Sequence, residues 1–241
     1  MNFLGQIKAV FFDADDTIVE LNGSLGKLYA DVAKRHNVDL CADSINSRVI
    51  DVWNSIRLEY RNEAGNYTTS PQREKAMWIK FIGLLLDDVC REPIRDTLYH
   101  SIYEEFAYAR SRALKKDVLA FVGYLAERDM VLGVLSNNDS RICRLLDDMQ
   151  IASHFDHVIP TAEIGYKKPS PRCFDIVRER LGFEAKELLY IGDNVETDYH
   201  GARSAGWNAL CFNEKGSDYE IDPAHQFASY SDLIERLKKS T

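Results

Sequence analysis

Three carboxylates and a threonine directly follow a short apolar run near the start of the sequence. The run Ala9–Phe12 leads into Asp13-Ala14-Asp15-Asp16-Thr17. Crowded carboxylates raise one another's pKa and oppose folding unless a cation neutralises them. Taken alone, the run is equally well explained as an Asp-rich turn after a strand. A metal site is therefore predicted only if other parts of the sequence supply partners for these acids.

Polar side chains also follow two later apolar runs, and a loop with two lysines lies between them. The groups after the runs 131–135 and 188–191 are a hydroxyl, amides and acids: Ser136-Asn137-Asn138, Gly192-Asp193-Asn194 and Asp198. In the loop 165–171, Pro169 disfavours a helical conformation for Lys168 and helps to hold this residue in place. Lys167 is predicted to point outward. These segments supply several acids, a hydroxyl and a positioned lysine.

Short apolar runs alternate with amphipathic helical patterns from about residue 117 onward. This alternation is typical of a parallel sheet with helices on both faces. Between residues 20 and 112 the pattern is helical, with no strand of any length. We therefore predict an α/β fold with a doubly wound, Rossmann-like core (residues 1–19 and 113–241) and an all-helical cap (residues 20–112) inserted after the first strand. In such sheets the site lies beyond the carboxyl ends of the strands, where these polar residues fall.

This set of residue types favours phosphoryl transfer to an enzyme carboxylate. Magnesium prefers oxygen ligands, which Asp13, a main-chain carbonyl near Asp15, and Asp193 could supply. A carboxylate can accept a phosphoryl group. Ser136, Lys168 and backbone amides suit the charge that spreads over the transferring oxygens. The second acid, Asp15, could protonate the leaving oxygen and then deprotonate the attacking water.

These residues, in this order, resemble the four motifs of the haloacid-dehalogenase superfamily, and in particular its phosphatase-type branch with a helical (C1-type) cap. The motifs are Asp13-Ala14-Asp15-Asp16-Thr17, Ser136, Lys168-Pro169, and Gly192-Asp193 with Asp198. The resemblance implies a role for each residue: Asp13 as nucleophile and magnesium ligand, Asp15 as general acid and base and part of the metal site, Lys168 as a catalytic and phosphate-binding residue, Ser136 and Asn137 as substrate binders, Asp193 as a magnesium ligand, and Asp198 and Asn194 as supporting residues.

The resemblance implies a magnesium-dependent phosphatase that hydrolyses a small phosphorylated metabolite through an aspartyl-phosphate intermediate. A sugar phosphate, a nucleoside monophosphate or a small phosphoacid would each fit. Asp15 favours phosphate esters, because the branches that cleave carbon–halogen or carbon–phosphorus bonds lack this second acid. A phosphomutase uses the same motifs and stays open, as does a catalytically idle binding module.

The composition is that of an ordinary soluble protein. The 241 residues carry a net charge of −8 and a pI near 5.3, which argues against a nucleic-acid partner. No apolar run reaches the length of a membrane span, and no signal-peptide pattern precedes the first strand. Five scattered cysteines predict free thiols, a reducing cytoplasm and no zinc site. We expect a cytoplasmic monomer or homodimer whose partner is a small-molecule phosphate ester.

Candidates for recognising the substrate lie in the helical insert. Five side chains could face the active site, although a solvated helix face explains the arginines equally well: Arg57, Tyr60, Arg61, Tyr67 and Arg73. Trp53 and Trp78 are predicted to belong to the hydrophobic core of the cap. The insert carries no signature that identifies one substrate.

Overall fold

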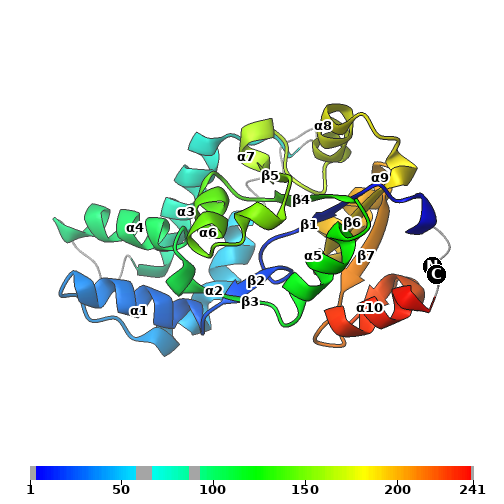
Figure 1. Cartoon of the computed structure of the whole chain (residues 1–241). Helices are drawn as coiled ribbons and strands as arrows, with labels where there is room; N and C mark the ends of the chain where they lie inside the picture. Colours follow the sequence, from blue (N-terminus) through cyan, green and yellow to red (C-terminus); the bar gives the residue numbers. More distant parts are fainter. Residues whose placement is uncertain (1–3, 58–66, 87–92, 240–241) are drawn as a thin grey trace.

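A six-stranded sheet forms the centre of one half of the molecule (Figure 1). The computed structural model describes residues 4–57, 67–86 and 93–239. The strands run in the order β5-β4-β1-β6-β7-β8, and neighbouring strands are parallel. Their bounds are β1 Ala9–Phe12, β4 Val131–Ser136, β5 His157–Pro160, β6 Leu188–Gly192, β7 Asn208–Phe212 and β8 Gln226–Phe227. This architecture confirms the predicted fold class.

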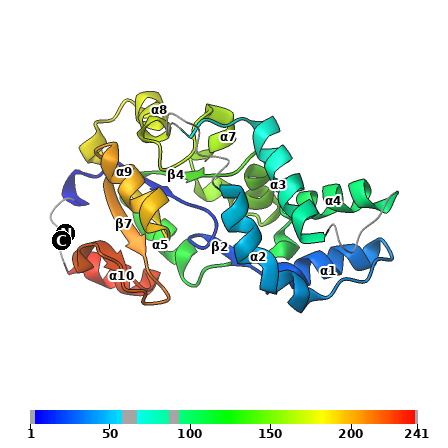
Figure 2. The same cartoon turned by 180° about the vertical axis from the view of Figure 1, so that it is seen from behind.

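Helices cover both faces of this sheet (Figures 1 and 2). One face packs against α5 (Val118–Ala126), α6 (Arg141–Asp148) and α10 (Tyr230–Lys238). The other face packs against α8 (Pro171–Leu181) and α9 (Gly201–Ser204). A parallel sheet that is buried on both sides needs apolar residues at successive positions, which explains the unbroken apolar runs in the sequence.

The central strand β1 shows how this burial fixes the start of the site. Val10 and Phe12 pack on the face that α5 covers, whereas Ala9 and Phe11 pack on the face that α8 covers. The chain therefore emerges at Asp13 from a fully buried strand. The main-chain N–H of Asp13 still donates to the Ile191 carbonyl at 2.8 Å, so this residue is held at the edge of the sheet.

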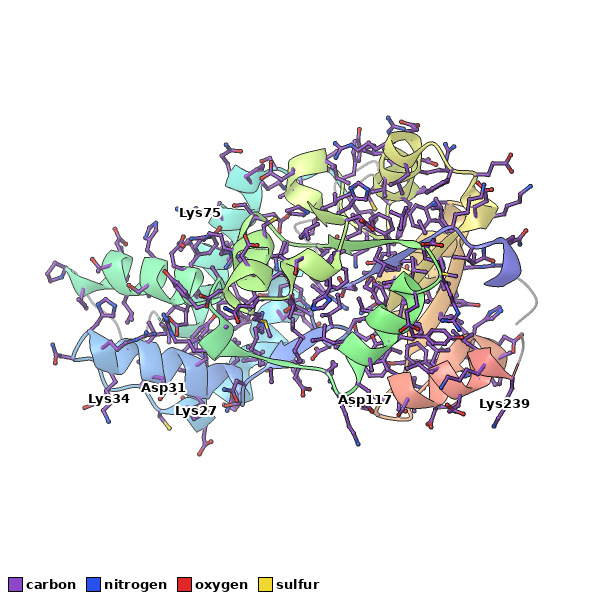
Figure 3. The ribbon with its side chains drawn as sticks, viewed as in Figure 1. Lys27, Asp31, Lys34, Lys75, Asp117 and Lys239 are labelled. Atoms are coloured by element: carbon purple, nitrogen blue, oxygen red, sulfur yellow. The ribbon has the colours of Figure 1, made fainter. Side chains whose placement is uncertain are left out.

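In the described part of the chain, four helices form the other half of the molecule and pack around a hydrophobic cluster of their own (Figure 2). On α1, Tyr29 and Val32 face this cluster. Figure 3 shows Lys27 and Asp31 projecting from the outer side of the same helix, where they form an exposed ion pair. The helices are α1 Leu25–Arg35, α2 Ala42–Arg57, α3 Pro71–Leu86 and α4 Ile94–Glu105.

A two-stranded antiparallel sheet joins the helical segment to the rest of the chain. It pairs β2 (Val19–Leu21) with β3 (Arg112–Leu114). The prediction that residues 20–112 contain no strand is therefore wrong at both ends, because three-residue strands are too short to show a pattern. The division into a core (1–19 and 113–241) and a cap (20–112) stays a prediction. The separate hydrophobic cluster of α1 to α4 supports it.

Several short elements were not predicted or differ in extent. The strand β8 and the helix α7 (Thr161–Ile164) are too short for a periodic pattern. The chain after β6 forms a π-helical segment, η6 (Val195–His200), followed by α9. The remaining short helices are η1 Leu4–Gln6, η3 Ala109–Ser111, η4 Ala152–His154, η5 Ala185–Glu187 and η7 Pro223–His225. Within the described ranges, no helix has the length and apolar character needed to cross a membrane.

Candidate active site

Lys168 lies at the centre of a polar cluster at the carboxyl edge of the sheet. Its side chain is buried, and Nζ donates to Asp13 Oδ1 at 2.8 Å and to Asp198 Oδ1 at 2.7 Å. Nζ also donates to the hydroxyl oxygen of Tyr190 at 2.6 Å, and the Tyr190 O–H in turn donates to the Leu135 carbonyl at 2.6 Å. An ammonium group has three hydrogens, and each has an acceptor here. Lys168 is therefore fixed beside Asp13.

Three carboxylates share this region with a single ammonium group. One oxygen each of Asp13, Asp193 and Asp198 lies within 4.8 Å of the others. Burial raises the pKa of Asp13, and burial together with the nearby Asp198 carboxylate raises the pKa of Asp193 to about 7. Burial lowers the pKa of Lys168, but Asp13 and Asp198 more than offset this effect and raise it. Three negative charges against one positive charge leave the cluster short of two positive charges.

The turn after β6 holds Asp198 in position. Asn194 Oδ1 accepts two backbone N–H groups at the start of η6, at 3.1 and 3.0 Å, and the Asn194 N–H donates to Asp198 Oδ2 at 3.1 Å. A Cβ atom on Gly192 would lie 2.2 Å from that same oxygen, so only glycine allows this close approach. Because Oδ1 of Asp198 accepts from Lys168, both oxygens of this carboxylate are engaged.

The end of β4 supplies Ser136 and Asn137. The pairing of Phe12 with Val134 places the buried Ser136 level with the residues that follow β1. The Lys168 N–H donates to Asn137 Oδ1 at 2.8 Å, and Asn137 Nδ2 donates to the Lys168 carbonyl at 3.0 Å. These two bonds hold the backbone of the lysine loop (residues 165–171), and the substrate contact of Asn137 stays a prediction.

The carboxylate of Asp15 lies outside the group of three carboxylates. Its Oδ1 accepts from Nη2 of Arg112, a buried side chain on β3, at 2.8 Å. Asp16 has a φ of 57°, and its N–H donates to the Val19 carbonyl at 2.7 Å, which turns the chain toward β2. The carboxylate of Asp15 is not in the candidate metal-binding group. A contribution of Asp15 to a metal site therefore falls to its main-chain carbonyl.

The lysine loop is attached to the helical segment. Lys167 was predicted to point outward, but its side chain is only 11% exposed, and Nζ donates to Glu74 Oε2 at 3.0 Å. Glu74 lies on α3, is fully buried and also accepts the Thr69 hydroxyl. The Lys167 N–H donates to the Tyr67 carbonyl at 2.9 Å, and the Thr69 N–H donates to the Gly165 carbonyl at 2.9 Å. Backbone and side chains thus join this loop to the start of α3.

A cavity of about 510 Å³ lies beside Asp15, between the loop after β1 and the helical segment. Asp16, Glu20, Arg112 and Arg141 contribute charged groups to its lining. The remaining lining residues are mostly apolar or aromatic: Leu21, Gly23, Leu25, Val49, Trp53, Trp78, Phe81, Phe106 and Asn138. The cavity opens onto Asp15, whereas Asp13 and Lys168 lie outside its lining. The site therefore has a compact charged part and a larger aromatic part.

Among the described residues, those predicted to recognise the substrate (Arg57, Tyr67 and Arg73) do not line this cavity. Arg57 lies at the end of α2, and Arg73 Nη1 donates to the Thr68 carbonyl at 3.0 Å. Tyr67 contributes a main-chain carbonyl to the lysine loop, as described above. Two further candidates, Tyr60 and Arg61, fall outside the described residues. Trp53 was predicted to lie in the cap core, but it is 38% exposed and lines the cavity.

Three residues with evident roles in this site were not found from the sequence. Tyr190 lies in an apolar strand, where it has the pattern of a core residue. Arg112 lies 97 positions from Asp15, and Glu74 lies 93 positions from Lys167, so no local spacing connects either pair. Their roles come from tertiary contacts. A buried glutamate on an otherwise apolar helical face was the only signal available for Glu74.

The fold and the site together define an α/β protein with an acidic, lysine-containing centre at the carboxyl edge of a parallel sheet. A model of the haloacid dehalogenase-like hydrolase family matches residues 7–206. Because this match covers most of the chain, the protein belongs to the haloacid dehalogenase-like hydrolases. This result confirms the family resemblance seen in the sequence.

Relatives within the family are named for different activities. Haloacid dehalogenase-like hydrolase domain-containing protein 3 of Danio rerio is 24% identical, and the match covers 98% of both chains. Glyceraldehyde 3-phosphate phosphatase of Methanothermobacter thermautotrophicus is 24% identical over 90% of both chains. (S)-2-haloacid dehalogenase 2 of a Pseudomonas species is 25% identical over 83% of this chain and 87% of its own. Sequence similarity thus shows a hydrolase family but not one reaction.

Solved structures show the same fold. The magnesium-bound crystal structure of the HAD-hydrolase YfnB from Bacillus subtilis superimposes with a TM-score of 0.76 at 21% identity. The alignment covers 96% of this chain and 98% of that one. At this level of identity the similarity concerns the fold alone.

Proposed function

We propose that this hydrolase is a magnesium-dependent phosphatase that cleaves phosphate monoesters of small molecules. One observation supports this most strongly: Lys168 holds the Asp13 carboxylate at 2.8 Å, while Asp15, two residues on, faces a separate cavity. Asp13 attacks phosphorus and forms an aspartyl-phosphate as the bond to the leaving oxygen breaks. Asp15 protonates that oxygen and later accepts a proton from the water that hydrolyses the intermediate. Lys168 and Ser136 bind the phosphate oxygens.

The donor set fits magnesium. Asp13 and Asp193 offer hard oxygen ligands, and a dication supplies the two positive charges that the cluster lacks. Asp198 already uses both oxygens, so its task is to hold Lys168. Asn194 supports the same arrangement from the turn. When bound, magnesium would stabilise the charge that develops on the transferring phosphoryl group.

The position of Asp15 favours phosphate esters over the reaction named for the Pseudomonas relative. A halide leaves as a stable anion and needs no proton, whereas an alcohol leaves well only when its oxygen is protonated. Asp15 is paired with Arg112 at 2.8 Å and lies next to the space where a leaving group fits. The phosphatase from Methanothermobacter supports the same choice. We infer that Asp15 is the proton carrier.

Hydrolysis of ethyl phosphate and nitrophenyl phosphate, with magnesium and with chelator, tests this proposal. We expect chelation to abolish turnover and Asp13→Asn to lower kcat by about 10⁴-fold or more on both esters. Asp15→Asn lowers kcat by about 10²- to 10⁴-fold on ethyl phosphate. Release of nitrophenolate in the first turnover is affected much less, because nitrophenolate leaves without a proton, whereas the later hydrolysis of the aspartyl-phosphate is slowed for both esters. Asp31→Asn, an exposed acid on α1, is the matched control and retains wild-type activity.

The outcome separates the alternatives. If Asp13→Asn retains wild-type turnover, the covalent mechanism is wrong. Isomerisation that requires a bisphosphate cofactor, with negligible hydrolysis, would show a phosphomutase. If the wild type turns over neither ester and binds magnesium no better than Asp193→Asn does, the protein is a catalytically idle binding module.

A further inference from the structure

We propose that the leaving group of the substrate is a neutral alcohol that carries an aromatic ring, and that this ring binds in the cavity beside Asp15. This inference rests on the proposed phosphatase function and narrows its substrate class. It favours esters such as nucleoside monophosphates or arylalkyl phosphates over small phosphoacids and simple sugar phosphates.

The position of the cavity identifies its occupant. A general acid must lie within hydrogen-bonding distance of the leaving oxygen. Asp13 and Lys168 hold the phosphoryl side of the ester, and the Asp15 carboxylate, two residues after Asp13, accepts from Arg112. Asp15 lines the cavity, which extends into the helical segment. The group attached to the leaving oxygen therefore enters this cavity.

Aromatic rings make up much of the lining of the cavity. The indoles of Trp53 and Trp78 stack at a centroid distance of 5.7 Å and an interplanar angle of 20°. Phe81 meets both edge-to-face, at 5.9 and 5.8 Å. Phe106 completes the aromatic lining next to Arg112, whose guanidinium lies 5.0 Å from its ring centroid. Such surfaces bind planar rings by stacking.

The charges in the cavity disfavour an anionic leaving group. Arg112 is paired with Asp15, and Arg141 is paired with Asp139 at 2.9 Å. Three acids and two arginines line the cavity, so it has no excess positive charge for a second carboxylate or phosphate: Asp15, Asp16, Glu20, Arg112 and Arg141. Its volume of about 510 Å³ also exceeds what a two- or three-carbon acid fills and lies within the range of ring-sized ligand sites, about 300–1,000 Å³.

Two pairs of esters isolate the contribution of the ring. In the first pair, a nucleoside 5′-monophosphate and ribose-5-phosphate both release the 5′ primary alcohol of ribose. In the second pair, phenylethyl phosphate and ethyl phosphate release similar primary alcohols. Leaving-group chemistry is therefore matched within each pair. We expect kcat/KM to be higher for the ring-bearing member by about 5- to 150-fold, the range of one stacked ring. The first pair tests a nucleobase and the second a plain aryl group. Phosphoglycolate, with an anionic leaving group, is expected to be the poorest substrate.

Two variants on α2 connect this preference to the cavity. Trp53→Ala removes a cavity wall, whereas Ile50→Ala truncates an apolar side chain that is 72% exposed on the same helix and outside the cavity lining. Trp53→Ala should remove most of the ring preference, Trp53→Phe should restore part of it, and Ile50→Ala should leave it unchanged. A ratio of kcat/KM values within each pair corrects for any general loss of activity.

The inference and the proposed function fail in different ways. Magnesium-dependent hydrolysis of all esters without a ring preference overturns the inference and leaves the phosphatase intact. Preference for phosphoglycolate also overturns it. If the wild type hydrolyses nothing, calorimetry with magnesium and a pair of phosphonates, phenylpropyl and propyl, decides the question without turnover. Tighter binding of the phenyl compound, lost in Trp53→Ala, supports the aromatic site, and equal or absent binding of the two refutes it.

Discussion

Replacing Glu74 by glutamine removes the negative charge that faces Lys167 and keeps the shape of the side chain. Glu74 is fully buried, and Lys167, which binds it at 3.0 Å, is only 11% exposed. Solvent therefore screens little of this interaction. The ammonium of Lys167 would lose the acid that compensates its burial. We expect the folded state to lose stability at the contact between α3 and the lysine loop.

The expected size follows from this burial. Removing one partner of a buried ion pair costs about 3–5 kcal/mol. Because glutamine retains an oxygen that can accept from Thr69 and Lys167, the expected loss in unfolding free energy is near the lower end, about 3 kcal/mol. Lys167→Met should cost a similar amount. The loss in unfolding free energy of the double variant should be about 2 kcal/mol smaller than the sum of the two single losses, because the two residues interact directly.

Urea unfolding followed by tryptophan fluorescence measures these values. The matched control is Glu104→Gln, which breaks the ion pair of Glu104 with Arg144 at 2.7 Å. That pair also joins α4 to α6, but its side chains are 40% and 50% exposed, so its loss should cost less than about 1 kcal/mol. Equal effects of the buried and the exposed substitutions would refute the reasoning, as would strict additivity in the double variant.

Three further predictions concern the charged centre. Magnesium should raise the melting temperature more at about pH 8.5 than at about pH 6. Burial raises the pKa of Asp13 and raises that of Asp193 to about 7, so the metal-free protein loses stability as the pH rises and these groups ionise. A bound dication compensates this loss, because it binds only the ionised carboxylates. A calorimetric scan with and without chelator measures this, and an equal shift at both pH values would contradict it. Gly192→Ala should lower kcat by about 10²-fold or more without unfolding the protein, because its Cβ atom would displace the Asp198 carboxylate; steady-state kinetics with circular dichroism tests this, and unchanged kcat would contradict it. Asn137→Ala should lower kcat by about tenfold with little change in KM if it only positions the lysine loop, and a rise in KM alone would show a direct substrate contact instead.

The sequence was sufficient for the sheet except its short strand β8, and for the residues that follow the strands around the site. Parallel strands bring their carboxyl ends to one edge, so Asp13, Ser136 and Asp193 could be placed together without a structure. The pairing of Phe12 with both Val134 and Ile191 now fixes that register. The strand positions can be read from the sequence because buried strands appear as unbroken apolar runs.

Contacts across the chain could not be predicted in the same way. Tyr190 lies within an apolar strand, and the role of its hydroxyl as an acceptor depends on Lys168, which comes from a distant loop. The error on Lys167 has the same origin, because its burial depends on Glu74 in a distant helix. The aromatic cavity was missed since tryptophans at helical spacing have the pattern of core residues. Partial exposure of Trp53 is a tertiary property.

The attachment of the lysine loop to α3 determines which segments would have to be exchanged together in a chimaera with another family member. Residues 67–69 make backbone bonds to residues 165–167, including a β-bridge between Thr68 and Tyr166, next to Lys168 itself. A chimaera that received helices α1 to α4 from another family member would lose these bonds. The donor would have to contribute its own lysine loop as well, so the unit that can be exchanged consists of two separate stretches of sequence.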